Sequence, residues 1–335
     1  MSTNGDGERH PTQQGFREFA RQLWGVLQRS LFRPRGVASP AVQEVSGLPK
    51  LYEPLRRIVL TDGVGHTLFE EYAAHREQER GEEETGWVLM GLRERDEAIV
   101  LATLPAGTQC DAGVAHVLFN SSGQALGSRI VRQSDKRLTI LGVVHTHPGS
   151  LRHPSDADFQ GDSLWVKQLR GNEGIFGIGT ADGTKLQSPV PRAAVFASRP
   201  RPNVQCLGEL CFSWYSLRPG QSHYDPLPLE LTLGPDLARP LHGVWSTLEE
   251  HAERLDRLYR QQAGVTCGVM EDGRGLALVV LVPLAEPGDA IRVLLRPKDV
   301  RYHVLRGGEV FAVDCPAESV DQGVYLLMAE LAGQV

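Results

Sequence analysis

The segment from residue 138 to residue 158 constrains the fold of this chain most, because a strand pattern changes there into a helix start. Residues 138–144 are apolar and rich in β-branched side chains, which predicts a buried strand. His145 and His147 continue this strand, and residues two apart on a strand point to the same face. Pro148 cannot donate to a β-ladder, so the strand ends there. The sequence therefore predicts two imidazoles that can reach one ion.

A helix start follows this strand after a loop. Ser155 stands at the N-cap position of a helix expected over residues 156–170, which puts Asp158 in the first helical turn. From there the Asp158 carboxylate can lean back toward the two histidines. Two imidazoles and one carboxylate leave the fourth position of a tetrahedral zinc ion open to water, which is typical of a catalytic site. We therefore predict a Zn²⁺ site formed by His145, His147 and Asp158.

Each part of this pattern also has an ordinary explanation. Ser-x-x-Asp is a helix-capping pattern that needs no metal, and a His-x-His pair on a strand can be two unrelated histidines. Each explanation accounts for only one part, whereas a metal site accounts for the histidines, the fixed gap, Ser155 and Asp158 together. His153 lies within the loop, and we interpret it as a loop residue rather than a ligand.

These residues resemble the JAB/MPN family of metalloproteases, whose motif is a distant Glu followed by His-x-His-Pro-x6-Ser-x-x-Asp. The family also has an upstream Glu-x-x-x-x-Leu-x-Gly, and the segment from Glu84 through Leu89 to Gly91 fits that spacing. Glu82 and Glu83 have the same chemistry but do not fit the spacing. A run of glutamates can also be the acidic end of a solvated helix. The downstream motif favours a functional role for Glu84.

The resemblance implies a zinc-dependent hydrolase in which Glu84 is the general base and Ser155 donates its hydroxyl to the oxyanion. It implies cleavage of a peptide or isopeptide bond after the C-terminal glycine of a ubiquitin-like protein. The implied partners are that modifier or its conjugate and, in bacterial conjugation systems that include antiviral ones, ubiquitin-activating-like and ubiquitin-conjugating-like enzymes. Two alternatives stay open, which are a hydrolase of a small amide on a carrier protein and a non-catalytic MPN scaffold.

Composition narrows the class of protein. A chain of 335 residues with 41% hydrophobic and 23% charged residues is expected to form two globular domains. A formal net charge of −6 argues against nucleic acid as the main partner. The N-terminus has no signal-peptide core, and no stretch holds about 18 uninterrupted apolar residues, which predicts a cytoplasmic protein without a membrane span.

The cysteines are odd in number and form no close-spaced pair typical of a zinc site. Both features argue against a disulfide framework. We therefore predict reduced core thiols at all five positions, namely Cys110, Cys206, Cys211, Cys267 and Cys315.

The chain is expected to divide into five segments. Apolar residues recur at helical spacing in the second segment, so this amphipathic helix must bury one face. Docking on the protein body or on another subunit is the simplest explanation, and a membrane surface or a partner groove is the alternative. The segments are a disordered tail (1–13), the amphipathic helix (14–36), a linker (37–49), the JAB/MPN domain (50–225) and a C-terminal α+β domain of unknown role (226–335).

The predicted fold class is α+β. The resemblance implies a JAB/MPN-type, cytidine-deaminase-like core with a mixed sheet flanked by helices, and a second α+β domain follows it. In the core we expect helices at 65–80 and within 120–137, and strands at 87–92, 98–104, 113–119, 175–180, 192–197 and 210–217. In the C-terminal domain we expect helices at 241–262 and 320–332, and strands at 265–270, 276–282, 291–295, 302–305 and 310–313.

Overall fold

The structure is a computed structural model. It describes residues 52–107, 111–113, 116–118, 120–182, 197–317 and 319–333. The predictions for the tail, the amphipathic helix and the linker lie outside the described residues. The same holds for Cys110 and for most of the strand expected at 192–197.

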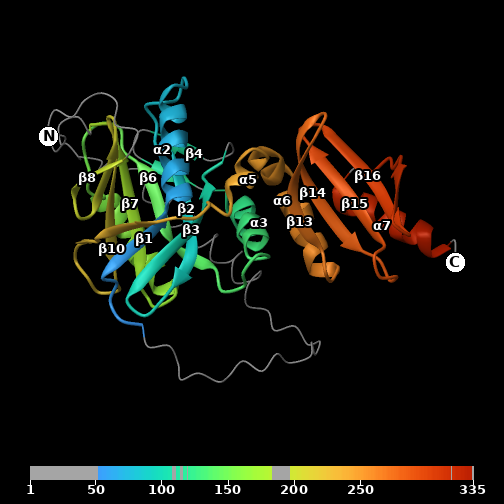
Figure 1. The fold of residues 1–335 in the computed structure, drawn as a ribbon, viewed down its shortest axis with the longest axis horizontal. Coiled ribbons are helices and arrows are strands. Elements are labelled where there is room, and N and C mark those ends of the chain that lie inside the picture. Colours follow the sequence, from blue (N-terminus) through green and yellow to red (C-terminus); the bar gives the residue numbers. More distant parts are fainter. Residues whose placement is uncertain are drawn as a thin grey trace, which may run out of the picture.

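A ten-stranded mixed sheet forms the larger part of the molecule (Figure 1). Its strands are, in order across the sheet, β12 (Leu229–Thr232), β1 (Arg57–Thr61), β3 (Glu97–Pro105), β2 (Gly86–Arg93), β6 (Thr139–Thr146), β7 (Gly174–Thr180), β10 (Leu210–Leu217), β9 (Val204–Leu207) and β8 (Ser198–Arg201), with β11 (Asp225–Pro226) against β10. The β12–β1, β1–β3 and β6–β7 pairs are parallel, and the other pairs are antiparallel.

Helices cover both faces of this sheet. Helix α2 (Asp62–Arg76) packs on one face, where Leu68 joins Leu89 and Phe212 in one apolar cluster. Helices α3 (Ser121–Val131) and α4 (Asp156–Trp165) lie on the other face, where Val88 belongs to a second cluster. Val88 and Leu89 are neighbours on β2 and point to opposite faces, as a strand requires. The short turn η1 (Val166–Gln168) follows α4, and the two-stranded sheet of β4 (Asp111–Gly113) and β5 (His116–Leu118) lies between β3 and α3 in the chain.

The C-terminal part is a five-stranded antiparallel sheet between helices. Two helices, α5 (Arg239–His242) and α6 (Trp245–Gln261), precede it and α7 (Val320–Gly333) follows it. Its strands, in order, are β13 (Thr266–Asp272), β14 (Gly275–Pro283), β15 (Ala290–Arg296), β16 (Asp299–Arg306) and β17 (Glu309–Val313). One cluster of buried apolar residues continues from α3 through α6 into this sheet, so the two sheets share a core layer.

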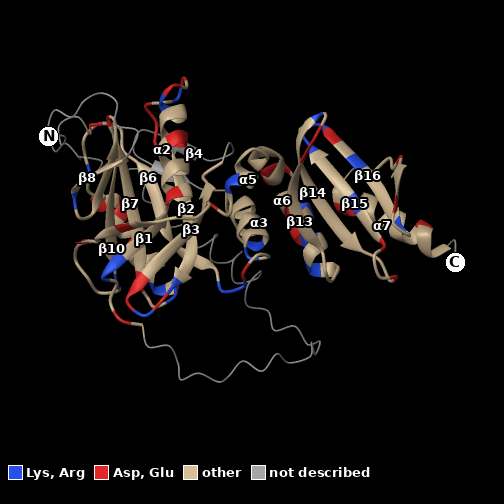
Figure 2. Cartoon of the chain, in the orientation of Figure 1, with Lys and Arg blue, Asp and Glu red and all other residues tan. Residues whose placement is uncertain are grey.

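The predicted fold class is confirmed, with differences in the detail of elements. The helix expected at 156–170 ends at Trp165 and continues as the turn η1. The single strand expected at 113–119 is replaced by the short strands β4 and β5. The first sheet also crosses the domain boundary expected at 225/226, because β12 pairs with β1. Figure 2 shows Lys and Arg as well as Asp and Glu scattered over both parts of the molecule.

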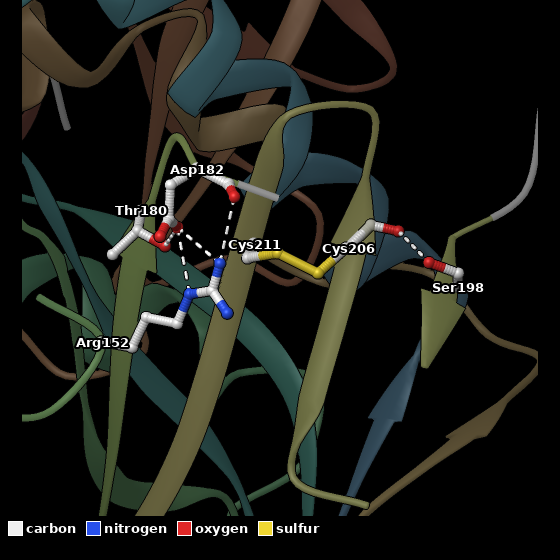
Figure 3. Close-up of a disulfide and its surroundings, with 6 residues drawn as sticks. All are labelled: Arg152, Thr180, Asp182, Ser198, Cys206 and Cys211. Atoms are coloured by element: carbon white, nitrogen blue, oxygen red, sulfur yellow. Dashed lines mark hydrogen bonds and ion pairs between the residues drawn. A yellow bond between two sulfur atoms is a disulfide. The ribbon is translucent and has the colours of Figure 1, made fainter. Parts of the chain in front are cut away.

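The prediction of reduced thiols is wrong for Cys206 and Cys211. These residues form a disulfide between β9 and β10 (Figure 3). They are directly opposite each other in the strand register, with Cα atoms 4.1 Å apart, which lies just below the usual range for a disulfide. The sequence did not indicate β9, so a hairpin that brings the two side chains together was not foreseen. Cys267 and Cys315 are free, as predicted.

Candidate metal centre

Strand pairing brings the predicted catalytic glutamate to the histidines. Strand β6 lies between β2 and β7, and Gly86 of β2 is directly opposite His145. The backbone N–H of Thr146 donates to the Thr85 carbonyl at 2.8 Å, and the Thr85 N–H donates to the Thr146 hydroxyl at 2.9 Å. Glu84 immediately precedes Thr85, which these two hydrogen bonds hold against Thr146. Glu84 therefore lies at the same end of the sheet as His145. The side chains there are withdrawn from solvent, since Glu84 is 6% and His145 7% exposed.

A glycine three residues before the first histidine lets β6 lie close to β7. Gly142 pairs with Ile175 of the parallel strand β7. A Cβ atom at position 142 would lie 1.7 Å from the Ile175 carbonyl oxygen. The close approach of the two strands therefore requires glycine at this position.

Three side chains meet as the sequence predicts. The Nε2 atoms of His145 and His147 lie 3.0 Å apart. The Oδ1 atom of Asp158 lies 3.4 Å from the Nε2 of His145, and the Oδ2 atom lies 3.5 Å from the Nε2 of His147. Taking one ligand atom from each of the three residues, these atoms all lie within 4.8 Å of one another. The strand and the first turn of α4 therefore direct one oxygen and two nitrogen ligands at a common point.

The loop between β6 and α4 fixes the tautomer of one histidine. The Nδ1 of His147 lies 2.9 Å from the backbone carbonyl oxygen of Leu151. A carbonyl only accepts, so Nδ1 carries the proton and Nε2 presents a lone pair to the other ligands. Sequence patterns do not show this contact, because it depends on the path of the loop.

The same loop is anchored to neighbouring strands at this end of the sheet. The Arg152 side chain donates to the Asp182 carboxylate at 3.0 Å, and the hydroxyl of Thr180 donates to the same carboxylate oxygen at 2.8 Å (Figure 3). The hydroxyl of Tyr215 donates to the Arg152 carbonyl at 2.8 Å. Thr180 lies at the end of β7 and is paired with Cys211 of the disulfide. The loop that carries Leu151 is therefore held from two strands.

Ser155 contacts Asp158 in two ways. Its hydroxyl donates to the Asp158 Oδ2 at 2.8 Å, and its backbone N–H donates to the same oxygen at 2.6 Å. The Asp158 N–H in turn donates to the Ser155 hydroxyl at 3.2 Å, which completes a capping box. The capping explanation and the metal explanation are thus compatible, because the same bonds start α4 and orient the Asp158 carboxylate.

The electrostatics of the cluster favour a positive charge between these groups. Burial alone would lower the pKa of His145, but the carboxylates of Asp158 and Glu84 raise it to about 9. Burial would raise the pKa of Asp158, but the two imidazoles hold it well below its usual value. Burial raises the pKa of Glu84 to about 7, and the imidazoles offset part of that rise.

The donor set fits zinc. Ligand atoms about 2.0–2.1 Å from a tetrahedral zinc ion lie about 3.3 Å apart. The two imidazole nitrogens here lie 3.0 Å apart, and each has one oxygen of the Asp158 carboxylate at 3.4 or 3.5 Å. Two nitrogens and one oxygen make an open site of the catalytic type, and the described residues supply no thiol beside them. Two imidazole lone pairs directed at each other also require a cation or a proton between them.

Residues 66–189 match the model of a family described as prokaryotic homologues of the JAB domain. This domain belongs to the JAB/MPN family. No curated protein matches the chain. A solved solution structure, protein DSY2949 from Desulfitobacterium hafniense, is 18% identical over 53% of this chain and 95% of its own, with a TM-score of 0.33.

A buried pair supports α4 from outside the segment that matches the JAB family. Asp162 lies one helical turn after Asp158 and is 2% exposed. The hydroxyl of Tyr224, beyond β10, donates to the Asp162 carboxylate at 2.8 Å. Burial, together with the nearby Asp158, raises the pKa of Asp162 well above its usual value. No motif signalled this contact, because Tyr224 lies 62 residues further along the chain.

A groove of about 470 Å³ opens beside Glu84 of the JAB domain. Helix α2, residues 78–85 and residues 105–107 form most of its wall. His242 of α5 and Trp245 of α6 complete it. The C-terminal part of the chain therefore contributes to the surface next to the predicted base.

No helix among the described residues has the length and apolar character needed to cross a membrane.

Proposed function

We propose that the protein is a zinc-dependent hydrolase that cleaves the peptide or isopeptide bond after the C-terminus of a ubiquitin-like protein. A JAB/MPN domain is a hydrolase or a scaffold, and one observation favours the hydrolase. His145, His147 and Asp158 meet at one point, with Glu84 buried at the same end of the sheet. A scaffold gains nothing from a buried acid beside a three-residue ligand set.

The proposed roles follow from position. His145, His147 and Asp158 would hold the zinc ion, with the Nε2 atoms of both histidines directed inward. When bound, zinc supplies the Lewis acidity that activates a water molecule and polarises a carbonyl oxygen. The Leu151 carbonyl keeps His147 in the tautomer that this role needs.

Glu84 is the proposed general base. A carboxylate in this place takes a proton from the attacking water and returns it to the departing amine. No hydrogen bond to another described side chain occupies the Glu84 carboxylate, whereas Glu71 and Glu173 are both bonded. The Ser155 hydroxyl, which now donates to Asp158, can rotate about its Cβ–Oγ bond and donate to the oxyanion of the substrate.

The proposed substrate and partners rest on the resemblance to the JAB/MPN family. A ubiquitin-like protein or its conjugate is the expected substrate, and ubiquitin-activating-like and ubiquitin-conjugating-like enzymes of a bacterial, for example antiviral, system are the expected partners. The cytoplasm is the proposed location. The Cys206–Cys211 disulfide is more typical of an oxidising compartment, so the thiol content of the protein isolated from cells tests that location separately.

The Glu84→Gln variant tests the proposal. Gln keeps the size of the side chain but cannot act as a base. We expect cleavage of ubiquitin-like fusion and isopeptide substrates to fall by about 10²- to 10⁴-fold while the zinc content stays unchanged. Glu82→Gln, which changes a neighbouring glutamate outside the motif spacing, is the matched control and should retain activity.

The same experiment separates the alternatives. If cleavage of a small carrier-linked amide depends on Glu84 and ubiquitin-like substrates are inert, the reaction is that of the carrier-protein alternative. If wild type holds zinc but cleaves neither class, and partner binding is unaffected by Glu84→Gln, the domain is a scaffold.

A further inference from the structure

The two edges of the C-terminal sheet differ. Strand β13 forms one edge and is bonded to the segment after α3. The Gln133 side chain donates to the Cys267 carbonyl at 2.9 Å and accepts from the Cys267 N–H at 3.0 Å. Strand β17 forms the other edge, and its one partner among the described strands is β16. One edge is thus occupied by the JAB domain side of the molecule, while no described strand pairs with the outer side of the other.

Strand β17 lacks several of the features that keep an edge strand from pairing, and its one charged residue, Glu309, stands at its first position. Its sequence, Glu-Val-Phe-Ala-Val, contains no Lys and no Pro, and it pairs with β16 without a bulge. Val310 and Phe311 are 50% and 48% exposed, and they point to opposite faces of the sheet. An edge that is apolar on both faces and open along its backbone is a template for another strand.

We propose that β17 pairs antiparallel with β17 of a second copy of this chain, around a two-fold axis at Phe311. Such a pairing is isologous, because the same residues face each other from both sides. Phe311 then lies opposite Phe311 of the partner subunit, and Val310 lies opposite the partner's Ala312. Glu309 lies opposite the partner's Val313, so no like charges meet across the interface.

A tight turn aligns β17 with the rest of its own sheet. Gly307 and Gly308 both have positive φ angles, of 59° and 85°, and form the tight connection from β16. The backbone of β17 therefore leaves the turn already aligned with the sheet. The two-fold pairing continues the sheet into ten strands across two subunits, with the two β17 strands in the middle.

The proposed pairing keeps the candidate metal centre of each subunit accessible. In Figure 1, β13 lies toward the ten-stranded sheet, and β14, β15 and β16 follow in order away from it. Pairing through β17 therefore joins the ends of two molecules that are farthest from their JAB domains. The groove beside Glu84 is lined by none of the residues of the proposed interface.

The strength of the contact can be bounded. Pairing of two five-residue strands adds about four to six main-chain hydrogen bonds and buries Val310 and Phe311 from each copy. This interface is smaller than the roughly 1,200–2,000 Å² of a standard stable complex. We therefore expect a reversible dimer with a dissociation constant in the micromolar range, visible as a concentration-dependent mass.

Analytical ultracentrifugation of the full chain across about 1–100 μM tests the pairing. Wild type is expected to approach twice the 36.8 kDa of one chain at the upper end of this range. Phe311→Lys and Phe311→Glu place like charges opposite each other at the axis, so each variant alone should stay monomeric. An equimolar mixture of the two should form the dimer again, which a merely misfolded variant cannot do.

Two controls separate this surface from others. Leu276→Lys changes a 43% exposed residue of β14 in the same sheet and should leave the dimer intact. Trp24→Asp changes the segment 14–36, whose apolar pattern also predicts self-association, and should likewise leave the dimer intact. A monomeric wild type, a Phe311→Lys dimer, a mixture that stays monomeric, or dissociation by Trp24→Asp alone would each overturn the proposal.

Discussion

The two sheets of this molecule are covered differently, and the difference shows where function is located. The ten-stranded sheet carries helices on both faces, and strands β7 and β10 are buried along their full length. At one end of this sheet, Glu84, His145 and His147 are buried together. The five-stranded sheet shares its core with α6 and α7, whereas β17 is exposed along nearly its full length. The first sheet provides a rigid support for the candidate metal centre, and the second sheet has an exposed edge strand, β17.

Removal of a metal ligand should have the largest effect on the first sheet. His147→Ala takes away one of the three ligands and is expected to lower zinc affinity by at least about 10²-fold, with loss of cleavage. Competition with a chromophoric chelator measures the affinity. His153→Ala, in the same loop but outside the cluster, should bind zinc as wild type does, and equal losses in both variants would contradict the assignment.

Truncation of one aromatic residue in each sheet compares the stability cost at a buried position with that at an exposed edge. Phe212 of β10 is fully buried and packs edge-on against Phe69, with ring centroids 5.1 Å apart. Phe212→Ala should lower the free energy of unfolding by about 3–5 kcal/mol, because it leaves a cavity. Phe311→Ala, on the exposed edge, should cost less than about 1 kcal/mol in denaturant unfolding of dilute protein. Similar losses at both positions would mean that the edge is covered.

A titratable pair joins the two parts and makes their contact sensitive to pH. The His242 ring of α5 contacts the Glu71 carboxylate of α2. Burial opposes charging of both groups, yet their mutual hydrogen bond raises the pKa of His242 and lowers that of Glu71. The His242 contribution is full below about pH 6.5 and is lost as pH rises through its folded pKa. The Glu71 contribution is full above about pH 4.5 and is lost as pH falls through its folded pKa.

The pair therefore stabilises the fold most between about pH 4.5 and 6.5. Thermal unfolding across pH 4 to 9 should show the difference in melting temperature between wild type and His242→Gln to be largest in that interval. His251→Gln is the control, because the pKa of His251 is lowered by burial rather than raised. A difference that is constant with pH would show that the pair does not titrate in this way.

A small effect is also expected at the occupied edge of the five-stranded sheet. Gln133→Ala removes both hydrogen bonds to the Cys267 backbone and is expected to cost about 1 kcal/mol in the free energy of unfolding. It also frees a stretch of β13, so light scattering of concentrated protein should rise. Gln133→Glu keeps one acceptor for the Cys267 N–H and should lose less than Gln133→Ala.

The sequence predicted local features well because they depend on neighbouring residues. The strand that ends in His145 and His147, and the helix start at Ser155, follow from alternation, proline and capping over about 20 residues. The spacing from Glu84 to Gly91 also selected the glutamate that strand pairing brings to β6. Each of these patterns is contained in one short segment.

Features that depend on an unrecognised strand or on distant partners were missed. The Cys206–Cys211 disulfide needed strand β9, whose Val-Gln-Cys-Leu sequence is too short to signal a strand. The bond from Tyr224 to Asp162 joins residues 62 positions apart. The inclusion of β12 in the first sheet depends on a parallel pairing with β1, about 170 residues earlier in the chain. Periodicity carries no information on such partners.

X-ray absorption spectroscopy at the zinc edge tests the central claim most directly. Protein loaded with one equivalent of Zn²⁺ should show two imidazole ligands and oxygen ligands in a shell at about 2.0–2.1 Å with no sulfur, as His145, His147 and Asp158 require. The spectrum of His147→Ala should show one imidazole ligand fewer. A sulfur ligand near about 2.3 Å, or a wild-type protein that binds no zinc, would contradict a metal centre built from these three residues.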